Sequence, residues 1–135
     1  MTPPNVESSY RRCCADASFL ARFRLALRAA DGQVSGIFDP LSARQQEVML
    51  DASIRAALDF SSGDPQGASR VSEMIHVHGR QGRVPVPPAL YPVWLESLIQ
   101  AVRETDPHWS DALERRWRAQ LMPAVDMFVE LYLSA

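Results

Sequence analysis

The chain has 135 residues, of which 47% are hydrophobic and 22% are charged, and its formal net charge is −2. A chain of this length can bury a core without help from metals or disulfides, so we expect one domain over residues 1–135. The composition is typical of a globular protein. It argues against extensive disorder and against nucleic-acid binding driven by bulk charge.

Neither a membrane span nor a covalent cross-link is expected. No apolar run approaches the ~18 residues of a transmembrane helix, and residues 1–6 lack the basic and apolar pattern of a secretory signal. Cys13 and Cys14 are adjacent, so they cannot join distant parts of a fold. We expect free thiols in a reducing cytoplasm. All 14 basic residues are arginines, which suit recognition of carboxylates.

The first half of the chain predicts three helices. Ser18 is a good N-cap for the second helix, and Gly32 follows its end. The segment 37–40 is expected to be irregular. Ser42 and Gln45 then fit a capping box with an apolar helix behind it. The expected helices cover about residues 6–15, 19–30 and 43–60.

The second half predicts three more helices after a turn cluster at 61–67. Gly79 ends the first of them, and Pro88 suits the first turn of the second. Asp106 and the proline after it break the chain again, and Pro123 is expected to kink the last helix. The expected helices cover about residues 68–78, 88–105 and 110–133. The sequence therefore predicts an all-α fold of about six helices that pack pairwise.

One apolar stripe of the expected 68–78 helix ends in a histidine. Its members, spaced i, i+3, i+4 and i+7, are Val71, Met74, Ile75 and His78. The spacing points His76 elsewhere. Two interpretations of His78 are open. It is either a core histidine bonded to a backbone carbonyl, or an axial iron ligand whose second ring nitrogen is held by a hydrogen bond.

A glutamine begins the apolar stripe of the 43–60 helix. The stripe consists of Gln46, Leu50, Ile54 and Ala57. Gln46 either lies at the exposed end of this stripe or forms a hydrogen bond to something polar in an apolar pocket.

The last two helices carry apolar stripes that are typical of core packing. The first stripe consists of Tyr91, Leu95, Leu98 and Val102. The second consists of Leu113, Trp117, Leu121, Ala124, Phe128 and Tyr132. The tyrosine hydroxyls would need hydrogen-bond partners if they are buried.

Taken in order, these segments resemble the globin domains of bacterial haemoglobins and flavohaemoglobins. The strongest part is His78-Gly79-Arg80, a loop, Pro87-Pro88 with Tyr91, and then Trp94-Leu95 with Leu98. The resemblance covers nearly the whole chain, although each motif is short. Other parts that carry it are Phe38, residues 44–50, residues 74–77, Asp106-Pro107, and Trp117-Arg118 with Tyr132. It implies a globin-like fold around non-covalent haem b, since the chain has no Cys-x-x-Cys-His motif.

The resemblance also implies roles for individual residues. His78 matches the proximal iron ligand, with His76 as the fallback. On the distal side, Phe38 matches the aromatic residue on the haem face, Gln46 the polar residue, and Leu50 the apolar residue over the iron. Tyr91 matches a tyrosine near the proximal histidine. Further residues expected around the haem are Met74, Ile75, Trp94 and Leu95, with Arg80 and Arg83 proposed as partners of the propionates.

The sequence departs from the family pattern in two places. Where flavohaemoglobin-like domains have a Phe-Tyr pair in the second helix, this chain has Phe23-Arg24, or Leu20 after a shift of one turn. An acidic partner for the proximal histidine is not evident either, because Tyr132 stands at the matching position and Glu130 lies two residues away.

We therefore expect a haem b globin that binds a diatomic gas, which is oxygen or alternatively nitric oxide or carbon monoxide. Gln46, Leu50 and Arg24 would contact the gas. The chain has no flavin or nicotinamide domain, so nitric oxide dioxygenation would need a separate reductase, and an enzyme is not predicted. No nucleic acid or membrane partner is expected. The alternative is a haem-free globin-fold sensor or interaction domain, with His78 in the core. A weaker third interpretation is a helical hydrolase or metalloenzyme.

Overall fold

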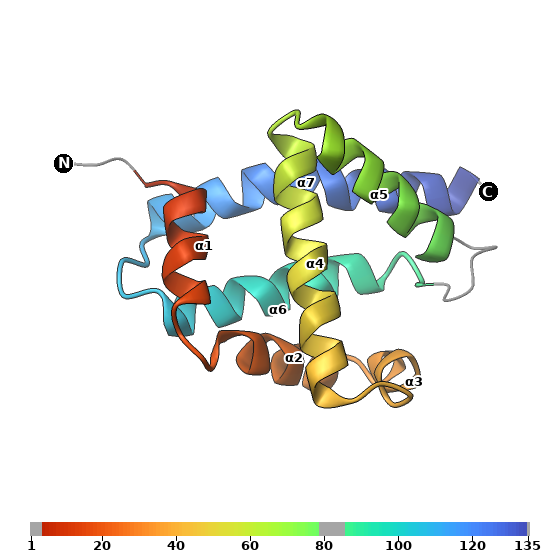
Figure 1. Cartoon of the computed structure of the whole chain (residues 1–135), viewed down its shortest axis with the longest axis horizontal. Coiled ribbons are helices and arrows are strands. Elements are labelled where there is room, and N and C mark those ends of the chain that lie inside the picture. The colour runs from red at the N-terminus through yellow and green to blue at the C-terminus, as the bar shows by residue number, and fades with distance from the viewer. Residues whose placement is uncertain (1–3, 79–85, 135) are drawn as a thin grey trace.

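The computed structural model describes residues 4–78 and 86–134, which form seven helices and no strand (Figure 1). The side chains of residues 68, 71, 72, 75–78 and 131–134 lie outside this description. The helices are α1 (Val6–Cys14), α2 (Phe19–Ala30), α3 (Gln33–Phe38), α4 (Ala43–Ser61), α5 (Pro65–His78), α6 (Leu90–Thr105) and α7 (Asp111–Ser134).

The predicted all-α fold is confirmed, and each of the six expected helices is present. The seventh, α3, lies partly where an irregular segment was expected. It has only 6 residues, too few to show a helical period, and its buried residues are Val34 and Phe38. Helix α5 begins at Pro65 and not near residue 68. Proline suits this position because the first turn of a helix has no use for its missing N–H group.

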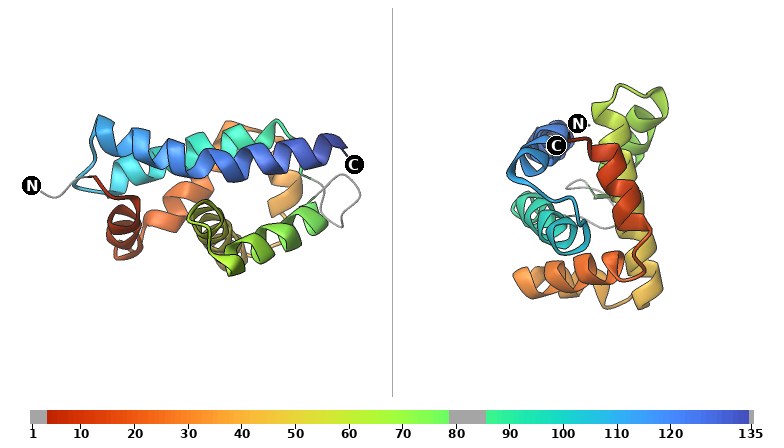
Figure 2. Two further views of the ribbon diagram at one scale, coloured as in Figure 1. Left: turned by 90° about the horizontal axis from the view of Figure 1, so that it is seen from above. Right: turned by 90° about the vertical axis from the view of Figure 1, so that its left-hand side faces the viewer.

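The helices form two layers around the core. Helices α6 and α7 run side by side in one layer, and α1, α4 and α5 lie in the other (Figures 1 and 2). Helix α2 packs mainly on α6, and α4 packs on both α5 and α7. The centre is apolar. The largest fully buried side chains include Trp117, Phe19, Phe23, Ile54, Leu98 and Ile99. Burial of such side chains contributes most of the stability of a helical domain.

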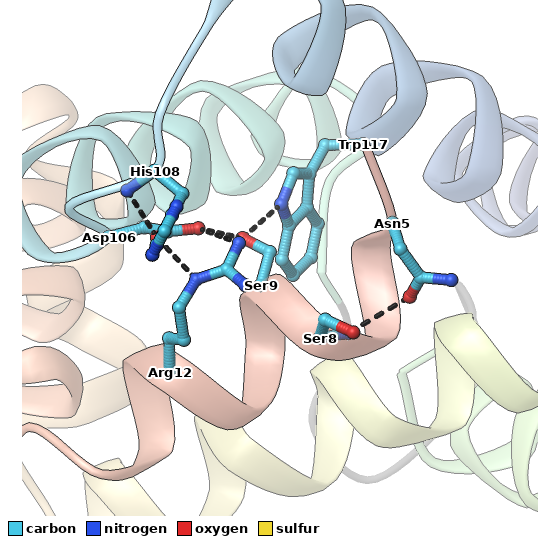
Figure 3. Close-up of polar contacts among 7 residues, drawn as sticks. All are labelled: Asn5, Ser8, Ser9, Arg12, Asp106, His108 and Trp117. Carbon is cyan, nitrogen blue, oxygen red and sulfur yellow. Dashed lines mark hydrogen bonds and ion pairs between the residues drawn. The ribbon is translucent and has the colours of Figure 1, made fainter. Parts of the chain in front are cut away.

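A polar cluster fastens α1 to the corner between α6 and α7 (Figure 3). The carboxylate of Asp106 is fully buried and accepts two bonds from Arg12, from Nε at 2.6 Å and from Nη2 at 2.9 Å. It also accepts from the Ser9 hydroxyl at 2.6 Å and the His108 backbone N–H at 2.8 Å. Ser9 in turn accepts from the indole N–H of Trp117 at 3.0 Å. The buried carboxylate of Asp106, the Ser9 hydroxyl and the Trp117 indole are therefore all paired.

This cluster holds Asp106 in its ionised form. Burial alone would raise the pKa of the carboxyl group, but hydrogen bonds from Arg12, Ser9 and His108 outweigh it, and the pKa is lowered. A carboxyl group with a lowered folded-state pKa contributes stability above its unfolded pKa of about 4. That contribution is lost as the pH falls through the lower, folded-state pKa.

The two cysteines are free, with Cys13 buried and Cys14 exposed. Burial raises the pKa of the Cys13 thiol to about 12. Among the described residues, no helix is both long and apolar enough to cross a membrane.

Replacing Asp106 by asparagine should lower the free energy of unfolding by about 3 kcal/mol at pH 7, because it leaves the Arg12 guanidinium without its charged partner. The difference should shrink below about pH 4, where the carboxyl group begins to protonate in the unfolded chain, and should be lost as the pH falls through the lower folded-state pKa. Urea denaturation at pH 7 and pH 3 measures both effects. The control is Glu7→Gln, which removes an exposed ion pair with Arg11 and should leave stability unchanged. Equal stability of Asp106→Asn and wild type at pH 7 would contradict this account.

Candidate functional site

A cavity of about 140 Å³ lies among helices α2 to α7, and its lining is almost entirely apolar. The described residues that line it are Leu27, Val34, Ile37, Phe38, Met49, Leu50, Ser53, Ala57, Met74, Val86, Leu90, Tyr91, Trp94, Ala124, Val125 and Phe128. Small apolar cavities exclude water. A pocket with mainly aliphatic and aromatic walls and few polar groups suits a flat, largely apolar ligand.

Five residues that were expected around a haem line this cavity. They are Phe38, Leu50, Met74, Tyr91 and Trp94. Leu95 was also expected there. It is buried in the core, packs with the stripe of α6, and is not among the lining residues. The structure thus brings together residues from α3, α4, α5 and α6 that are far apart in sequence.

The corner between α3 and α4 fixes the position of Phe38, which is almost fully buried. The predicted capping box is confirmed. The Ser42 hydroxyl accepts from the Gln45 backbone N–H at 3.1 Å, and the Gln45 side chain accepts from the Ser42 backbone N–H at 2.9 Å. These bonds satisfy two backbone donors at the start of α4. They also set the angle at which the chain enters that helix.

Gln46 is 5% exposed and braces the same corner. Its Nε2 group donates to the backbone oxygen of Phe38 at 3.0 Å and to that of Leu41 at 2.9 Å. Two carbonyl groups require a donor between them, so the orientation of the amide is determined by its surroundings. Its Oε1 atom is buried and accepts no hydrogen bond from any described residue.

This placement excludes an exposed Gln46, and the role expected for Gln46 at a bound gas stays a prediction. The side chain is not at an exposed end of the stripe, and it is not among the described residues that line the cavity. Both amide hydrogens are used by backbone carbonyl groups of the preceding corner. The periodicity of α4 could not reveal this partner, because the partner lies outside the helix.

Ser53 and Trp94 form a polar pair in the cavity wall. The indole N–H of Trp94 donates to the Ser53 hydroxyl oxygen at 3.0 Å, and that hydroxyl donates to the backbone oxygen of Leu50 at 2.6 Å. Serine hydroxyls commonly bond to a carbonyl group in the preceding helical turn. The pair links α4 to α6 in the cavity wall and gives the half-buried indole N–H an acceptor.

An aromatic stack links α6 to α7 at the cavity. The rings of Tyr91 and Phe128 lie 5.1 Å apart between centroids, with 18° between their planes. Offset stacking of this kind stabilises aromatic pairs beyond their simple burial. Both rings line the cavity.

On α2, the residue that lines the cavity is Leu27. Arg24 does not line the cavity. Its Nε group donates to Glu47 on α4 at 3.2 Å. Phe23 is fully buried and makes an edge contact with Trp94, with 6.1 Å between centroids. The alternative position Leu20 packs against the core. Counting back from Phe38 gave Arg24, whereas the α2 residue that lines the cavity is Leu27.

A tight turn positions α5 against α4. Gly63 has a φ angle of +81°, and the backbone N–H of Asp64 bonds to the oxygen of Asp59 at 3.1 Å. This is the Schellman arrangement that ends many helices, and it favours glycine at the left-handed position. Gly67 then allows close contact, since a Cβ atom there would lie 2.4 Å from the Asp59 carbonyl carbon. The first turn of α5 therefore rests directly on the end of α4.

Helix α5 carries the expected iron ligand at its end. Met74 lines the cavity, and His78 is the last residue of the helix. The side chains of Ile75, His76 and His78 lie outside the described residues. Arg80 and Arg83, expected to pair with propionates, fall in 79–85, which is likewise outside the description. The roles assigned to these five residues stay predictions.

Several cavity residues were not identified from the sequence. Val34 and Ile37 belong to α3, which was not predicted. Ala124 and Phe128 were assigned to a packing stripe, which has the same spacing as a cavity wall. The others are Leu27, Met49, Ser53, Ala57, Val86, Leu90 and Val125. Ser53 carried a signal, since it is a polar residue beside an apolar stripe, one turn after Met49 and Leu50.

Comparison with known proteins supports a globin-like fold. The sequence matches no protein-family model and no curated protein. Among solved structures, the chain is similar to the protein PA3967 from Pseudomonas aeruginosa, which is described as structurally highly homologous to a human haemoglobin. The two are 26% identical, with a TM-score of 0.87, over 94% of this chain and 95% of the other. The resemblance to bacterial single-domain globins is therefore supported by structure as well as by sequence.

Replacing Gly67 by alanine should lower the free energy of unfolding by about 2 kcal/mol, because the new methyl group meets backbone atoms that cannot move aside. The matched control is Gly36→Ala. Gly36 lies within α3 with no atom near its would-be Cβ, so alanine there should be neutral or slightly stabilising. Thermal or urea unfolding of both variants makes the comparison. Equal effects at the two positions would show that the close contact does not constrain α5.

Replacing Ser53 by alanine should lower the free energy of unfolding by about 1 kcal/mol, because the half-buried N–H of Trp94 loses its acceptor. In a Trp94→Phe background, the Ser53→Ala change should lower the free energy of unfolding by less, because phenylalanine has no N–H group that would be left without an acceptor. A double-mutant cycle measured by urea denaturation gives the coupling between the two side chains. Purely additive effects would show that the hydrogen bond contributes nothing.

Proposed function

Starting from the globin-like fold, we propose that this chain is a haem b-binding globin that reversibly binds a diatomic gas. One observation carries the proposal. An apolar cavity lies beside α5, the helix whose last residue is His78. The similarity to PA3967, a protein likened to a human haemoglobin, adds support.

The described residues fit the chemistry of a haem. The macrocycle needs apolar and aromatic walls, which Phe38, Tyr91 and Phe128 provide. It also needs one ligand on the proximal side. His78 follows Met74 by four residues in α5, and residues with this spacing share a face of a helix. Since Met74 lines the cavity, the spacing favours His78 over His76 as the ligand.

Each residue then has a defined task. His78 would bind the iron through a neutral imidazole nitrogen, and Arg80 and Arg83 would pair with the propionates. Bound haem would supply an iron with a coordination position for the gas. Phe38 and Leu50 would shield the ring from water, and the stacked rings of Tyr91 and Phe128 would pack against it.

The proposal concerns binding and not turnover. Sustained oxidation of nitric oxide would consume electrons, and these would have to come from a separate reductase. We place the protein in the cytoplasm, because an exposed free thiol such as Cys14 suits a reducing compartment. Storage and sensing of the gas are both compatible with reversible binding.

The test is haem uptake by the purified protein and its histidine variants. Wild type mixed with haemin should bind about one haem per chain, show an intense Soret band, and shift that band when reduced and exposed to carbon monoxide. His78→Ala should lose haem affinity or change the spectrum strongly, whereas His76→Ala should behave as wild type. Circular dichroism of each apoprotein checks that it is folded.

Two outcomes would contradict the proposal. A folded wild-type protein that takes up no haem would favour the alternative, a haem-free globin-fold sensor or interaction domain. A wild-type spectrum in His78→Ala together with loss of haem in His76→Ala would move the ligand to His76.

A further inference from the structure

A second cavity, of about 350 Å³, lies between α1, α4 and α7 and shares no residue with the apolar cavity. Most of its lining residues come from α1 and α4. They are Glu7, Tyr10, Arg11 and Cys14, then Arg55, Leu58, Asp59 and Ser62, and finally Gln120 from α7. None of them has a role in the proposed haem site.

The residues that α1 and α4 contribute form one stripe on each helix. Both sets follow the spacing i, i+3, i+4 and i+7. Stripes with this spacing are usually apolar where two helices pack against each other. Here each stripe carries one arginine and one acidic residue. The cavity is therefore a recess between two charged helix faces and not a defect in apolar packing.

The charged groups are sorted by sign along the cavity. Helices α1 and α4 run in opposite directions (Figure 1). Along α1, Glu7 comes before Arg11, and along α4, Arg55 comes before Asp59. The two carboxylates therefore lie toward one end of the cavity, and the two guanidinium groups lie toward the other.

Arg55 is held in place at the basic end. Its Nε group donates to the Asp51 carboxylate at 3.0 Å, and its guanidinium carbon lies 5.4 Å from the centre of the Tyr10 ring. The same carboxylate accepts from the Tyr10 hydroxyl, so Asp51 fixes both side chains. The two Nη groups of Arg55 donate to no residue in the described part of the chain. A planar guanidinium in this state suits a carboxylate that accepts two parallel bonds.

The other three charged groups have partners that a ligand can replace. Arg11 pairs with Glu7 at 2.5 Å, and these side chains are 72% and 74% exposed. Asp59 pairs with Arg70 at 2.9 Å, also at the surface. Exposed pairs of this kind contribute little to stability. A ligand that carries one charge of each sign therefore meets little competition from within the protein.

We propose that this cavity is a second binding site, which takes a short zwitterionic peptide of about dipeptide length. The carboxylate of the peptide binds Arg55 and Arg11, and its ammonium group binds Glu7 and Asp59. This site does not depend on the proposed haem function.

Both the length and the charge of the ligand follow from the lining. On each helix the acidic and basic residues are four positions apart, which is about 6 Å along the axis. An extended dipeptide spans up to about 7 Å, whereas a single amino acid is only half as long. The two positive and two negative groups of the lining cancel, so a simple anion such as phosphate would meet as much repulsion as attraction. The ring of Tyr10 and the side chain of Leu58 offer apolar contact to a peptide side chain.

The first experiment varies the ligand and leaves the protein unchanged. Isothermal titration calorimetry of the purified full chain with glycyl-leucine should show saturable binding of one peptide per chain. N-acetyl-glycyl-leucine lacks the ammonium group, and glycyl-leucinamide lacks the carboxylate. Each should bind about tenfold more weakly or worse, because charged hydrogen bonds are lost. Equal affinity for all three peptides, or no binding of glycyl-leucine at millimolar concentration, would overturn the proposal.

The second experiment locates the site with variants. Arg55→Gln should weaken the binding of glycyl-leucine about tenfold, and Glu7→Gln, at a more exposed position, about threefold. The matched control is Arg44→Gln, which removes an exposed arginine of α4 outside the cavity lining and should bind as wild type does. Circular dichroism checks the fold of each variant. Wild-type affinity in both Arg55→Gln and Glu7→Gln would overturn the proposal.

The Cys14 thiol provides an independent readout of occupancy, because it is exposed and lines the cavity, whereas Cys13 is buried. Saturating glycyl-leucine should slow the alkylation of Cys14 by N-ethylmaleimide, which mass spectrometry follows. N-acetyl-glycyl-leucinamide, which lacks both charges, should leave the rate unchanged. An unchanged rate with saturating glycyl-leucine would place the peptide elsewhere and overturn the proposal.

These outcomes are separate from those of the haem experiment. A wild-type protein that takes up no haem but binds glycyl-leucine would overturn the proposed function and support the peptide site. If Arg55→Gln does not fold, the three peptides on wild type and the Glu7→Gln variant decide the matter.

Discussion

The geometry of the cavity depends on how α4 is fastened at its two ends. At its start, the capping box and the Gln46 amide bind it to the corner that carries Phe38. At its end, the Schellman turn and the close contact at Gly67 place α5 directly upon it. Because α4 and α5 both line the cavity, these two local arrangements help to set its shape. The residues that make these two arrangements, Ser42, Gln45, Gln46, Gly63 and Gly67, do not line the cavity.

The buried carboxylate of Asp106 fixes the other end of the molecule. It ties α1 to the α6–α7 corner through Arg12, Ser9 and the His108 backbone. Ion pairs elsewhere also join helices, as with Arg22 and Glu104 or Arg118 and Glu96. Those pairs are more exposed, and pairs of that kind contribute little to stability. The cluster around Asp106 lies away from the cavity, so a change there affects the fold without altering the chemistry of the site.

Local signals in the sequence predicted much of the fold. The capping box at Ser42 and the break at Asp106 are short patterns with direct physical causes, and both are confirmed. Helix α3 was missed because six residues do not show a period. Counting back from Phe38 gave Arg24 as a gas contact, whereas the α2 residue that lines the cavity is Leu27. A residue one turn away on a helix faces a similar direction, so sequence alone cannot decide which of the two reaches a cavity.

The candidate site was predicted less completely than the fold, for a related reason. A stripe such as Ala124 and Phe128 has the same spacing whether it meets another helix or a cavity. The hydrogen bonds of Gln46 could not be predicted from the sequence, because its acceptors are the backbone oxygens of Phe38 and Leu41 and every residue has such an oxygen. A polar residue in an apolar stripe can therefore be assigned a structural role or a role at the site only when its hydrogen-bond partners are known.

The central claim is that the cavity beside α5 holds a haem bound by His78. The most direct measurement is a crystal structure of the protein grown with haemin, with an anomalous difference map collected at the iron edge. The account predicts one iron peak per chain within bonding distance of the His78 imidazole, with the macrocycle against Phe38 and Leu50. Haem bound by His78 would be contradicted by an iron peak elsewhere in the chain. It would also be contradicted by a map without an iron peak from crystals grown with excess haemin.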